Sequence, residues 1–236
     1  DRTRAIVFSN PANPTGAVYD ADDLARLLAW AARRDLFVIA DEVYRRIWFD
    51  TPPASALAFP EHRDRVIVVD SLSKTYSACG LRLGFLISRN EVLMEKVERL
   101  GQARLGTQPL SQHVGIAALE LDESYYESIR QTYRQRVETL MSALADVPGV
   151  RAPSPAGAFY TMVELPIDDS EAFARWLVTD FRHEGESVVV APGPGFYADP
   201  TSGRQQVRLA AVVDNDQLVR AADVLRRAIL AYPGRR

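Results

Sequence analysis

Lys74 stands in a group of polar residues that follows a short apolar stretch. Residues 66–69 read Val-Ile-Val-Val, a pattern typical of a buried strand, and Ser71, Ser73 and Lys74 follow, with Arg82 eight residues after the lysine. We interpret Lys74 as a Schiff-base lysine, and the two hydroxyls and Arg82 as ligands for the phosphate of the aldehyde cofactor that it binds. A solvated lysine at a strand end is the alternative interpretation.

Lysine is rare in this chain, which makes its position informative. The 28 Lys and Arg residues include only two lysines, Lys74 and Lys96. An arginine guanidinium stays protonated, whereas a lysine amine can lose its proton and then attack a carbonyl carbon. A lysine kept at the end of a buried strand, in a chain that otherwise uses arginine, therefore favours amine chemistry at Lys74.

A second polar group follows the first apolar stretch of the chain. Residues 5–9 (Ala-Ile-Val-Phe-Ser) are typical of a short buried strand, and residues 10–16 (Asn-Pro-Ala-Asn-Pro-Thr-Gly) follow it. Two Asn-Pro steps and a glycine neither continue a strand nor begin a helix, so they predict a rigid turn. Such a turn would hold the Asn13 amide at a fixed point beyond the strand, although a plain connecting turn is the alternative.

A third strand end carries Asp41 and Tyr44. The apolar residues 36–40 precede them, and an amphipathic helix is predicted at about residues 20–34. Unbroken apolar strands that alternate with helices indicate an α/β fold with a mostly parallel sheet and helices on both faces. Ligands of such sheets bind at the carboxyl ends of the strands. We therefore expect the three polar strand ends to form one site, although a single aspartate there is more often a helix cap.

A long amphipathic helix divides the chain. Apolar side chains recur at helical spacing from Tyr126 to Leu144 and predict a helix that links two domains. Residues 1–121 are expected to belong to the large α/β domain, and residues 122–236 to form the linking helix and a small α+β domain. In the small domain we predict strands at 157–163, 187–191 and 206–213, and helices at 169–183 and after the capping residue Asp214.

Arg208 is the chemically notable residue of the small domain. It lies between Val207 and Leu209 in a predicted strand. A charge at a half-buried position is costly unless it is paired, and a ligand carboxylate bound by the guanidinium fork would supply the pairing. An internal salt bridge or an outward-facing side chain is the alternative.

Composition excludes several classes of protein. A net charge of −3 argues against a strongly basic surface for nucleic acid, and no apolar run approaches the length of a membrane span. The three histidines lack metal-ligand spacing, and a single cysteine, Cys79, excludes an internal disulfide framework and fits a cytoplasmic protein. The chain opens without an initiator Met or a signal peptide, so we expect it to be part of a longer protein.

The order of these motifs resembles the class I and II aminotransferases, which are fold-type I enzymes that use pyridoxal 5′-phosphate. The resemblance covers about the last three-fifths of such enzymes. The motifs that carry it are Asn-Pro-x-Asn-Pro-Thr-Gly at 10–16, Asp-Glu-x-Tyr at 41–44, Ser-x-Ser-Lys at 71–74 followed by Arg82, and Val-Arg-Leu at 207–209. The resemblance implies the fold of a PLP-transferase large domain, without its N-terminal part, followed by a small C-terminal domain.

The resemblance also implies a role for each motif. Lys74 would form the aldimine with the cofactor and move the proton between the substrate Cα and the cofactor, and Asp41 would pair with the pyridinium nitrogen. Arg208 would bind the substrate α-carboxylate. The remaining motif residues would contact the cofactor's phenolic oxygen (Asn13 and Tyr44, with Asn13 also beside the substrate) or its phosphate (Ser71, Ser73 and Arg82).

The implied substrates are an L-amino acid and a 2-oxo acid such as 2-oxoglutarate. The segments at 157–160, 176–177 and 195–197 are similar to bacterial aspartate aminotransferases. A dicarboxylate needs a second cation, for which Arg104 is a candidate, although a solvated arginine at a helix end is the alternative. The resemblance further implies a homodimer for the full-length protein.

Two other functions remain open at this point. A β-lyase or a decarboxylase could use the same fold and cofactor. A transcription regulator with an aminotransferase-like sensing domain would share these motifs and would carry a helix-turn-helix before residue 1. The N-terminal part of the family would supply a ring-stacking aromatic residue, further phosphate ligands and part of the dimer interface.

Overall fold

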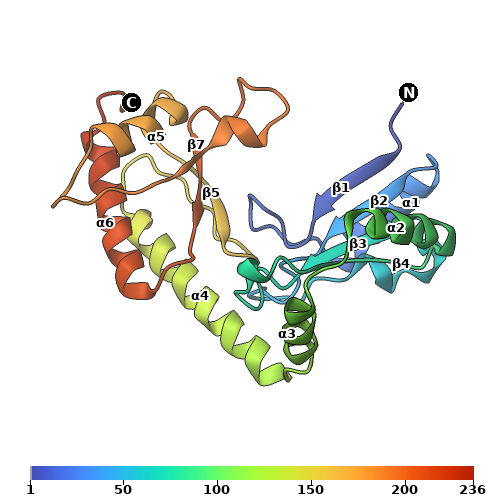
Figure 1. Ribbon diagram of the computed structural model, residues 1–236. Coiled ribbons are helices and arrows are strands. Elements are labelled where there is room, and N and C mark those ends of the chain that lie inside the picture. The colour runs from blue at the N-terminus through green and yellow to red at the C-terminus, as the bar shows by residue number, and fades with distance from the viewer. Residues whose placement is uncertain (1) are drawn as a thin grey trace. The chain divides into compact units, whose positions relative to one another are not determined.

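The computed structural model describes residues 2–236, which divide into two compact units (Figure 1). The first unit comprises the residues up to Ala12 and Ala17–Arg130, and the second comprises Asn13–Gly16 and Gln131–Arg236. The predicted domain boundary lies between residues 121 and 122. The contacts instead place residues 122–130 with the first unit and insert the turn Asn13–Gly16 into the second.

The first unit is built on a four-stranded sheet in the order β1-β2-β3-β4 (Figure 1). Its strands are β1 (Ala5–Ser9), β2 (Phe37–Asp41), β3 (Val66–Ser71) and β4 (Gly84–Ser88). The first three strands are parallel, and β4 runs antiparallel to β3. The predicted α/β class with a mostly parallel sheet is confirmed.

Helix α1 (Ala21–Ala32) covers one face of this sheet. The Asp20 side chain caps the helix by accepting a hydrogen bond from the Asp23 amide. Leu28 and Ala31 on its buried stripe pack against alternate residues of β2 and β3, including Val38 and Val66. Because side chains alternate along a strand, the neighbouring positions of β2 and β3 point to the other face.

Helices α2 (Glu91–Arg104) and α3 (Pro109–Leu119) follow β4. The two helices and the loop between them leave large apolar side chains exposed, among them Leu100, Leu105, Leu110, Ile116 and Leu119. No helix within residues 2–236 combines the length and the apolar character that crossing a membrane requires.

The second unit contains a three-stranded antiparallel sheet and two further helices. Helix α4 (Glu123–Ala145) leads into it from the first unit. The strands are β5 (Tyr160–Glu164), β6 (Ala191–Pro192) and β7 (Gln206–Ala210), in the order β5-β7-β6. The helices are α5 (Ser170–Thr179) and α6 (Asn215–Ala231), and Asp214 caps α6 as predicted.

Several predicted elements of the second unit are longer than the observed ones. The strand predicted at 187–191 shortens to Ala191–Pro192, the part that pairs with β7, and Val189 is 85% exposed. The helix predicted to reach residue 183 ends at Thr179, and β7 ends at Ala210. β-branched and apolar residues give a strand propensity, but a strand forms only where a partner accepts its hydrogen bonds.

Candidate active site

The carboxyl ends of β2 and β3 bring a carboxylate and a hydroxyl to one face of the sheet. Asp41 lies opposite Val69 in the parallel register, and Ser71 follows Val69 by two residues. Positions two apart on a strand share a face, so Asp41 and Ser71 point to the side of the sheet away from α1. The Asp41 Oδ1 atom accepts a hydrogen bond of 3.1 Å from the Val43 amide, which orients the carboxylate.

Lys74 occupies the turn that follows β3. Its neighbours Leu72 and Thr75 are buried at 1% and 4% exposure, while Ser73 and Lys74 remain partly exposed. The Ser73 amide donates a hydrogen bond of 2.9 Å to the Ser71 hydroxyl oxygen. The buried neighbours and this hydrogen bond hold the backbone of the turn, which directly follows the carboxyl end of β3.

Tyrosines of the first turns of α4 fix the same turn. The Tyr125 hydroxyl donates to the Thr75 carbonyl oxygen at 3.0 Å, and the hydroxyls of Tyr76 and Tyr126 lie 2.8 Å apart. Burial raises the pKa of Tyr76, and its hydrogen bond with Tyr126 acts in the same direction. Helical spacing predicts only a packing role for Tyr126, because it does not reveal which tyrosine hydroxyls contact a turn distant in the sequence.

Tyr44 lies in the turn after β2 and is 3% exposed. The neighbouring Glu42 is 2% exposed, and its Oε1 atom accepts hydrogen bonds from the Ser55 hydroxyl at 3.0 Å and the Ala56 amide at 2.8 Å. Burial raises the pKa of Glu42 despite these hydrogen bonds and the attraction of Arg45. Glu42 therefore fastens the turn that carries Tyr44 to the following loop.

Arg82 has an unusual backbone conformation. It follows the short 3-10 helix Cys79–Leu81 with a φ of +53°, and its exposed guanidinium donates a hydrogen bond of 3.0 Å from Nη1 to the Cys79 carbonyl oxygen. The left-handed region is unfavourable for a residue with a side chain, and such residues cluster at functional sites. The conformation is consistent with a ligand-binding role for Arg82.

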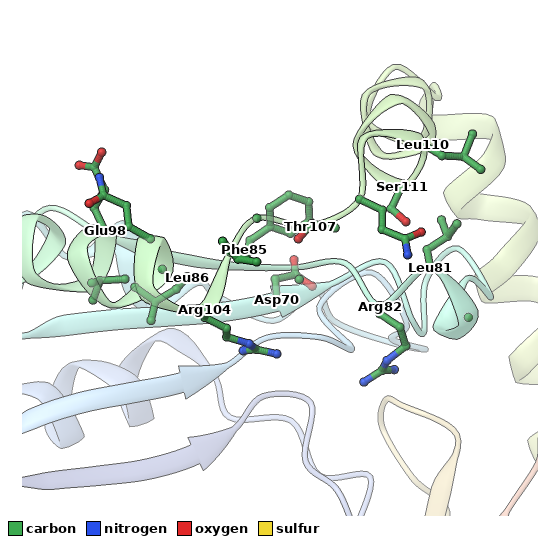
Figure 2. Close-up of a pocket in the computed structure, with 18 residues that line it drawn as sticks. Asp70, Leu81, Arg82, Phe85, Leu86, Glu98, Arg104, Thr107, Leu110 and Ser111 are labelled. Atoms are coloured by element: carbon green, nitrogen blue, oxygen red, sulfur yellow. The ribbon is translucent and has the colours of Figure 1, made fainter.

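A cavity of about 1260 Å³ brings Arg82 together with Arg104 (Figure 2). Arg104 ends α2, and Figure 2 shows both guanidinium groups on the same side of the strands, away from the carboxylate of Asp70. Burial raises the pKa of Asp70, although a hydrogen bond of 2.6 Å from the Ser71 amide and the attraction of Arg45 act to lower it. The two arginines give this side of the cavity an anion-binding character.

The second unit pairs Arg208 with Asn13. Arg208 Nη1 donates a hydrogen bond of 2.9 Å to Asn13 Oδ1. The guanidinium carbon lies 4.5 Å from the ring centroid of Tyr160 and 4.9 Å from that of Phe196. Because Arg208 lies opposite Met162 in the sheet, Tyr160 is its diagonal neighbour on the same face. An amide and two aromatic rings therefore orient this cation.

Gly16 fastens the Asn13 turn to the rest of the second unit. Its carbonyl oxygen accepts hydrogen bonds from the amides of Ala156 at 2.9 Å and Gly157 at 3.0 Å. A Cβ at Gly16 would lie 2.2 Å from the Cβ of Pro155, and the residue has a φ of +71°. The glycine is required here, and it fixes the turn that carries Asn13.

The polar strand ends predicted from the sequence fall into two groups. The first unit holds seven of the predicted residues, near the ends of β2 and β3 and along the cavity: Asp41, Tyr44, Ser71, Ser73, Lys74, Arg82 and Arg104. The second unit joins Asn13 to Arg208. That the two groups form one site stays a prediction.

The sequence does not predict that Tyr160 and Phe196 contact Arg208. The sequence signal for Tyr160 is an aromatic residue at the start of β5. That signal identifies a neighbour of Arg208 only when the strand register is known, because the register puts the two residues on one face of the sheet.

The residues present fit pyridoxal 5′-phosphate by their chemistry. The first unit offers an amine on Lys74, a carboxylate on Asp41 for a ring nitrogen, and hydroxyl and guanidinium groups on Ser71 and Arg82 for a phosphate. Among residues 2–236, no cluster of three or more His, Cys, Asp or Glu side chains could hold a metal ion.

Comparison with known proteins identifies relatives over nearly the whole chain. An aspartate aminotransferase from Musicola paradisiaca is 31% identical over 238 residues, covering 98% of this chain and 57% of its own length. An asparagine–oxo-acid transaminase from Streptococcus mutans is 31% identical over 220 residues, covering 91% of this chain and 54% of its own. The chain thus spans little more than half the length of these relatives.

The fold is also similar to that of solved aminotransferase structures. The crystal structure of an aromatic aminotransferase from Pyrococcus horikoshii superposes with a TM-score of 0.85 at 27% identity, covering 97% of this chain and 60% of that one. Residues 1–225 match the family model described as "Aminotransferase class I and II". The order of the motifs, the fold and these matches agree, and the chain belongs to the class I and II aminotransferase family.

Proposed function

We propose that the protein containing this chain is a pyridoxal-phosphate-dependent aminotransferase that exchanges an amino group between an L-amino acid and a 2-oxo acid. The observation that carries the proposal is the placement of Lys74. It is one of only two lysines, and it lies in a fixed turn after β3, beside the strand that ends in Asp41. The relatives named as aspartate aminotransferase and asparagine–oxo-acid transaminase support the same reaction class.

The proposed catalytic roles fall on different residues of the first unit. When bound, the cofactor supplies an aldehyde carbon and an electron-withdrawing ring. The Lys74 amine would hold the cofactor through that carbon and, once the substrate amine has displaced it, its Nζ would move a proton between the substrate Cα and the cofactor carbon. The Asp41 carboxylate keeps a proton on the ring nitrogen through its opposite charge. Tyr44 and Asn13 are the proposed hydrogen-bond donors to the phenolic oxygen.

The phosphate is held by charge and by hydroxyls. Arg82 supplies a guanidinium fork, which matches the geometry of phosphate oxygens, and Ser71 and Ser73 supply hydroxyl donors. Ser71 lies on the same face of the sheet as Asp41, which is consistent with one ligand touching both. The cofactor would thus be fixed at opposite ends, by its ring nitrogen and by its phosphate.

The substrate is bound through its carboxylates. Arg208 binds the α-carboxylate, and the hydrogen bond from Arg208 to Asn13 orients the guanidinium for that contact. Arg104 is the candidate cation for the second carboxylate of aspartate or 2-oxoglutarate, since it lies on the same side of the cavity as Arg82. We infer a cytoplasmic homodimer, and the exposed apolar residues of α2 and α3 support a protein partner for that surface.

The two lysines provide an internal control for the proposal. We expect incubation of the 236-residue chain with pyridoxal 5′-phosphate and reduction with borohydride to attach the cofactor to the Lys74 peptide. Lys96 lies exposed on α2 and should be labelled far less at substoichiometric cofactor. Lys74→Ala should abolish the adduct, and Lys96→Ala should leave it. Equal labelling of the two lysines would contradict the site.

The reaction class is tested with the full-length protein and an amino acid alone. A transaminase converts its bound cofactor to the pyridoxamine form and releases one equivalent of 2-oxo acid. A β-lyase or a decarboxylase would leave the aldehyde form of the cofactor unchanged at the end of the reaction. Absorbance spectra and quantification of the 2-oxo acid distinguish these outcomes.

A further inference from the structure

Phe196 contacts Arg208 without being part of the hydrophobic core. The ring is 36% exposed, and its centroid lies 4.9 Å from the guanidinium carbon. Tyr160, whose ring centroid is 4.5 Å from the same carbon, is 9% exposed and belongs to the core. A ring that remains this exposed gains little hydrophobic free energy from its position, so burial alone does not explain why it lies over a cation.

The segment that carries Phe196 is fastened to the strand that carries Arg208. Phe196 ends a 3-10 turn that begins at Gly193, directly after β6, and β6 pairs with β7 through Ala191 and Arg208. A Cβ on Gly193 would lie 2.3 Å from the Gly203 carbonyl oxygen. The backbone of the turn therefore packs closely against the segment before β7, which fixes the ring relative to the guanidinium.

We propose that Phe196 is a positioning residue for Arg208. Its ring, together with Tyr160, holds the guanidinium plane while Asn13 accepts one of its N–H groups. Rings that contact the faces of a guanidinium leave its in-plane N–H donors for a ligand, and these are the donors that a carboxylate engages with two parallel hydrogen bonds. A side chain already held in this orientation loses less freedom when the carboxylate binds.

This inference rests on the proposed function in one respect, namely that Arg208 binds the substrate carboxylate. It adds that the affinity of this contact depends on an aromatic ring at position 196. Phe196→Leu keeps an apolar side chain of similar size and removes the ring. Phe196→Tyr keeps the ring and should behave like the wild type.

A contact of the same kind elsewhere in the chain gives a matched control. The guanidinium carbon of Arg34, just after α1, lies 4.2 Å from the ring centroid of Trp30 on α1, which is 38% exposed. Trp30→Leu removes that contact and leaves the surroundings of Arg208 intact.

The first measurement needs neither cofactor nor activity. In the 236-residue chain labelled with ¹⁵N-arginine, the Arg208 Nε–H resonance is assigned by its loss in Arg208→Lys. Ring currents should shift this resonance in the wild type, and the shift should shrink in Phe196→Leu and persist in Phe196→Tyr. The other arginine resonances should stay in place, which reports that the variants are folded. An unshifted Arg208 resonance in the wild type would overturn the proposal.

The second measurement follows the same resonance during titration with succinate, a dicarboxylate without an amino group. We expect Phe196→Leu to weaken binding about three- to tenfold, and Phe196→Tyr and Trp30→Leu to stay within about twofold of the wild type. Wild-type affinity in Phe196→Leu would overturn the positioning role. Undiminished succinate binding in Arg208→Lys, measured by calorimetry because this variant lacks the Arg208 resonance, would instead refute the assignment of Arg208 in the proposed function, so the two failures are distinguishable.

Discussion

Arg208 Nη1 donates a hydrogen bond of 2.9 Å to Asn13 Oδ1, across a separation of 195 positions in the sequence. The bond joins strand β7 to a turn that follows the first strand of the chain. That turn belongs to the second compact unit, because Gly16 accepts two backbone hydrogen bonds from Ala156 and Gly157. A residue proposed to contact the cofactor and a residue proposed to bind the substrate are thus coupled directly.

Replacing Arg208 tests its role in substrate binding. Arg208→Lys keeps the charge and removes the planar fork, so we expect KM for the amino acid to rise about 30-fold, corresponding to about 2 kcal/mol, with a smaller effect on kcat. Steady-state kinetics of the full-length protein provide the measurement. Arg220→Lys, at an exposed position on α6, serves as the control and should leave KM unchanged.

Gly16 is expected to be intolerant of any side chain. In Gly16→Ala the new Cβ would collide with Pro155 and with the Tyr160 carbonyl oxygen, and the φ of +71° disfavours alanine. We expect the free energy of unfolding to fall by about 2–4 kcal/mol in urea denaturation of the 236-residue chain.

Gly101 is a control for Gly16, because its surroundings have room for a side chain. It lies in helix α2, and beyond the backbone of that helix no atom of residues 2–236 comes within 4 Å of the position that a Cβ would take. Gly101→Ala should therefore raise stability by roughly 0.5–1 kcal/mol. A similar loss of stability in the two variants would show that close packing around Gly16 is not the cause.

The hydroxyl pair of Tyr76 and Tyr126 should behave as a coupled unit. Removing either hydroxyl leaves the other without this 2.8 Å hydrogen bond, so each Phe variant should lose about 1–2 kcal/mol. The double variant should lose about as much as either single one, giving a coupling free energy of about 1–2 kcal/mol. Additive losses in this double-mutant cycle would argue against the bond. Tyr19→Phe, at an exposed ring, should change stability by less than about 0.5 kcal/mol.

Asp70 predicts a pH dependence of stability. Burial raises the pKa of its carboxyl in the folded chain above the unfolded value, so folding favours the protonated form. The stability that this group contributes is present at a pH below the unfolded value and is lost as the pH rises through the folded value. Asp70→Asn keeps an oxygen for the Ser71 amide and removes the charge.

We therefore expect Asp70→Asn to be more stable than the wild type at pH 7 and equal to it near pH 3. Chemical denaturation at the two pH values gives the comparison. A constant difference at the two values would contradict a contribution from ionisation. Asp64→Asn, at an exposed carboxyl in the loop before β3, is a suitable control.

Local sequence patterns predicted most of the first unit. The strand at 5–9, the helix near residues 20–34 and the polar ends of β2 and β3 follow from apolar runs, an amphipathic pattern and turn residues. The same patterns overextended the strand at 187–191, because Val188 and Val190 have strand propensity but the pairing with β7 begins at Ala191. Propensity is a property of the segment, whereas pairing depends on a neighbour.

By itself, the sequence determined which groups are present: a lysine where arginine is the rule, a carboxylate after a parallel strand, and an arginine in a half-buried strand. Only the tertiary structure decided what surrounds them. Arg208 is oriented by an amide from the Asn13 turn and by the rings of Tyr160 and Phe196, and the Lys74 turn is held by tyrosines of α4. Residue spacing reports contacts within one helix or strand, while these contacts arise from strand register and from turns that packing brings together.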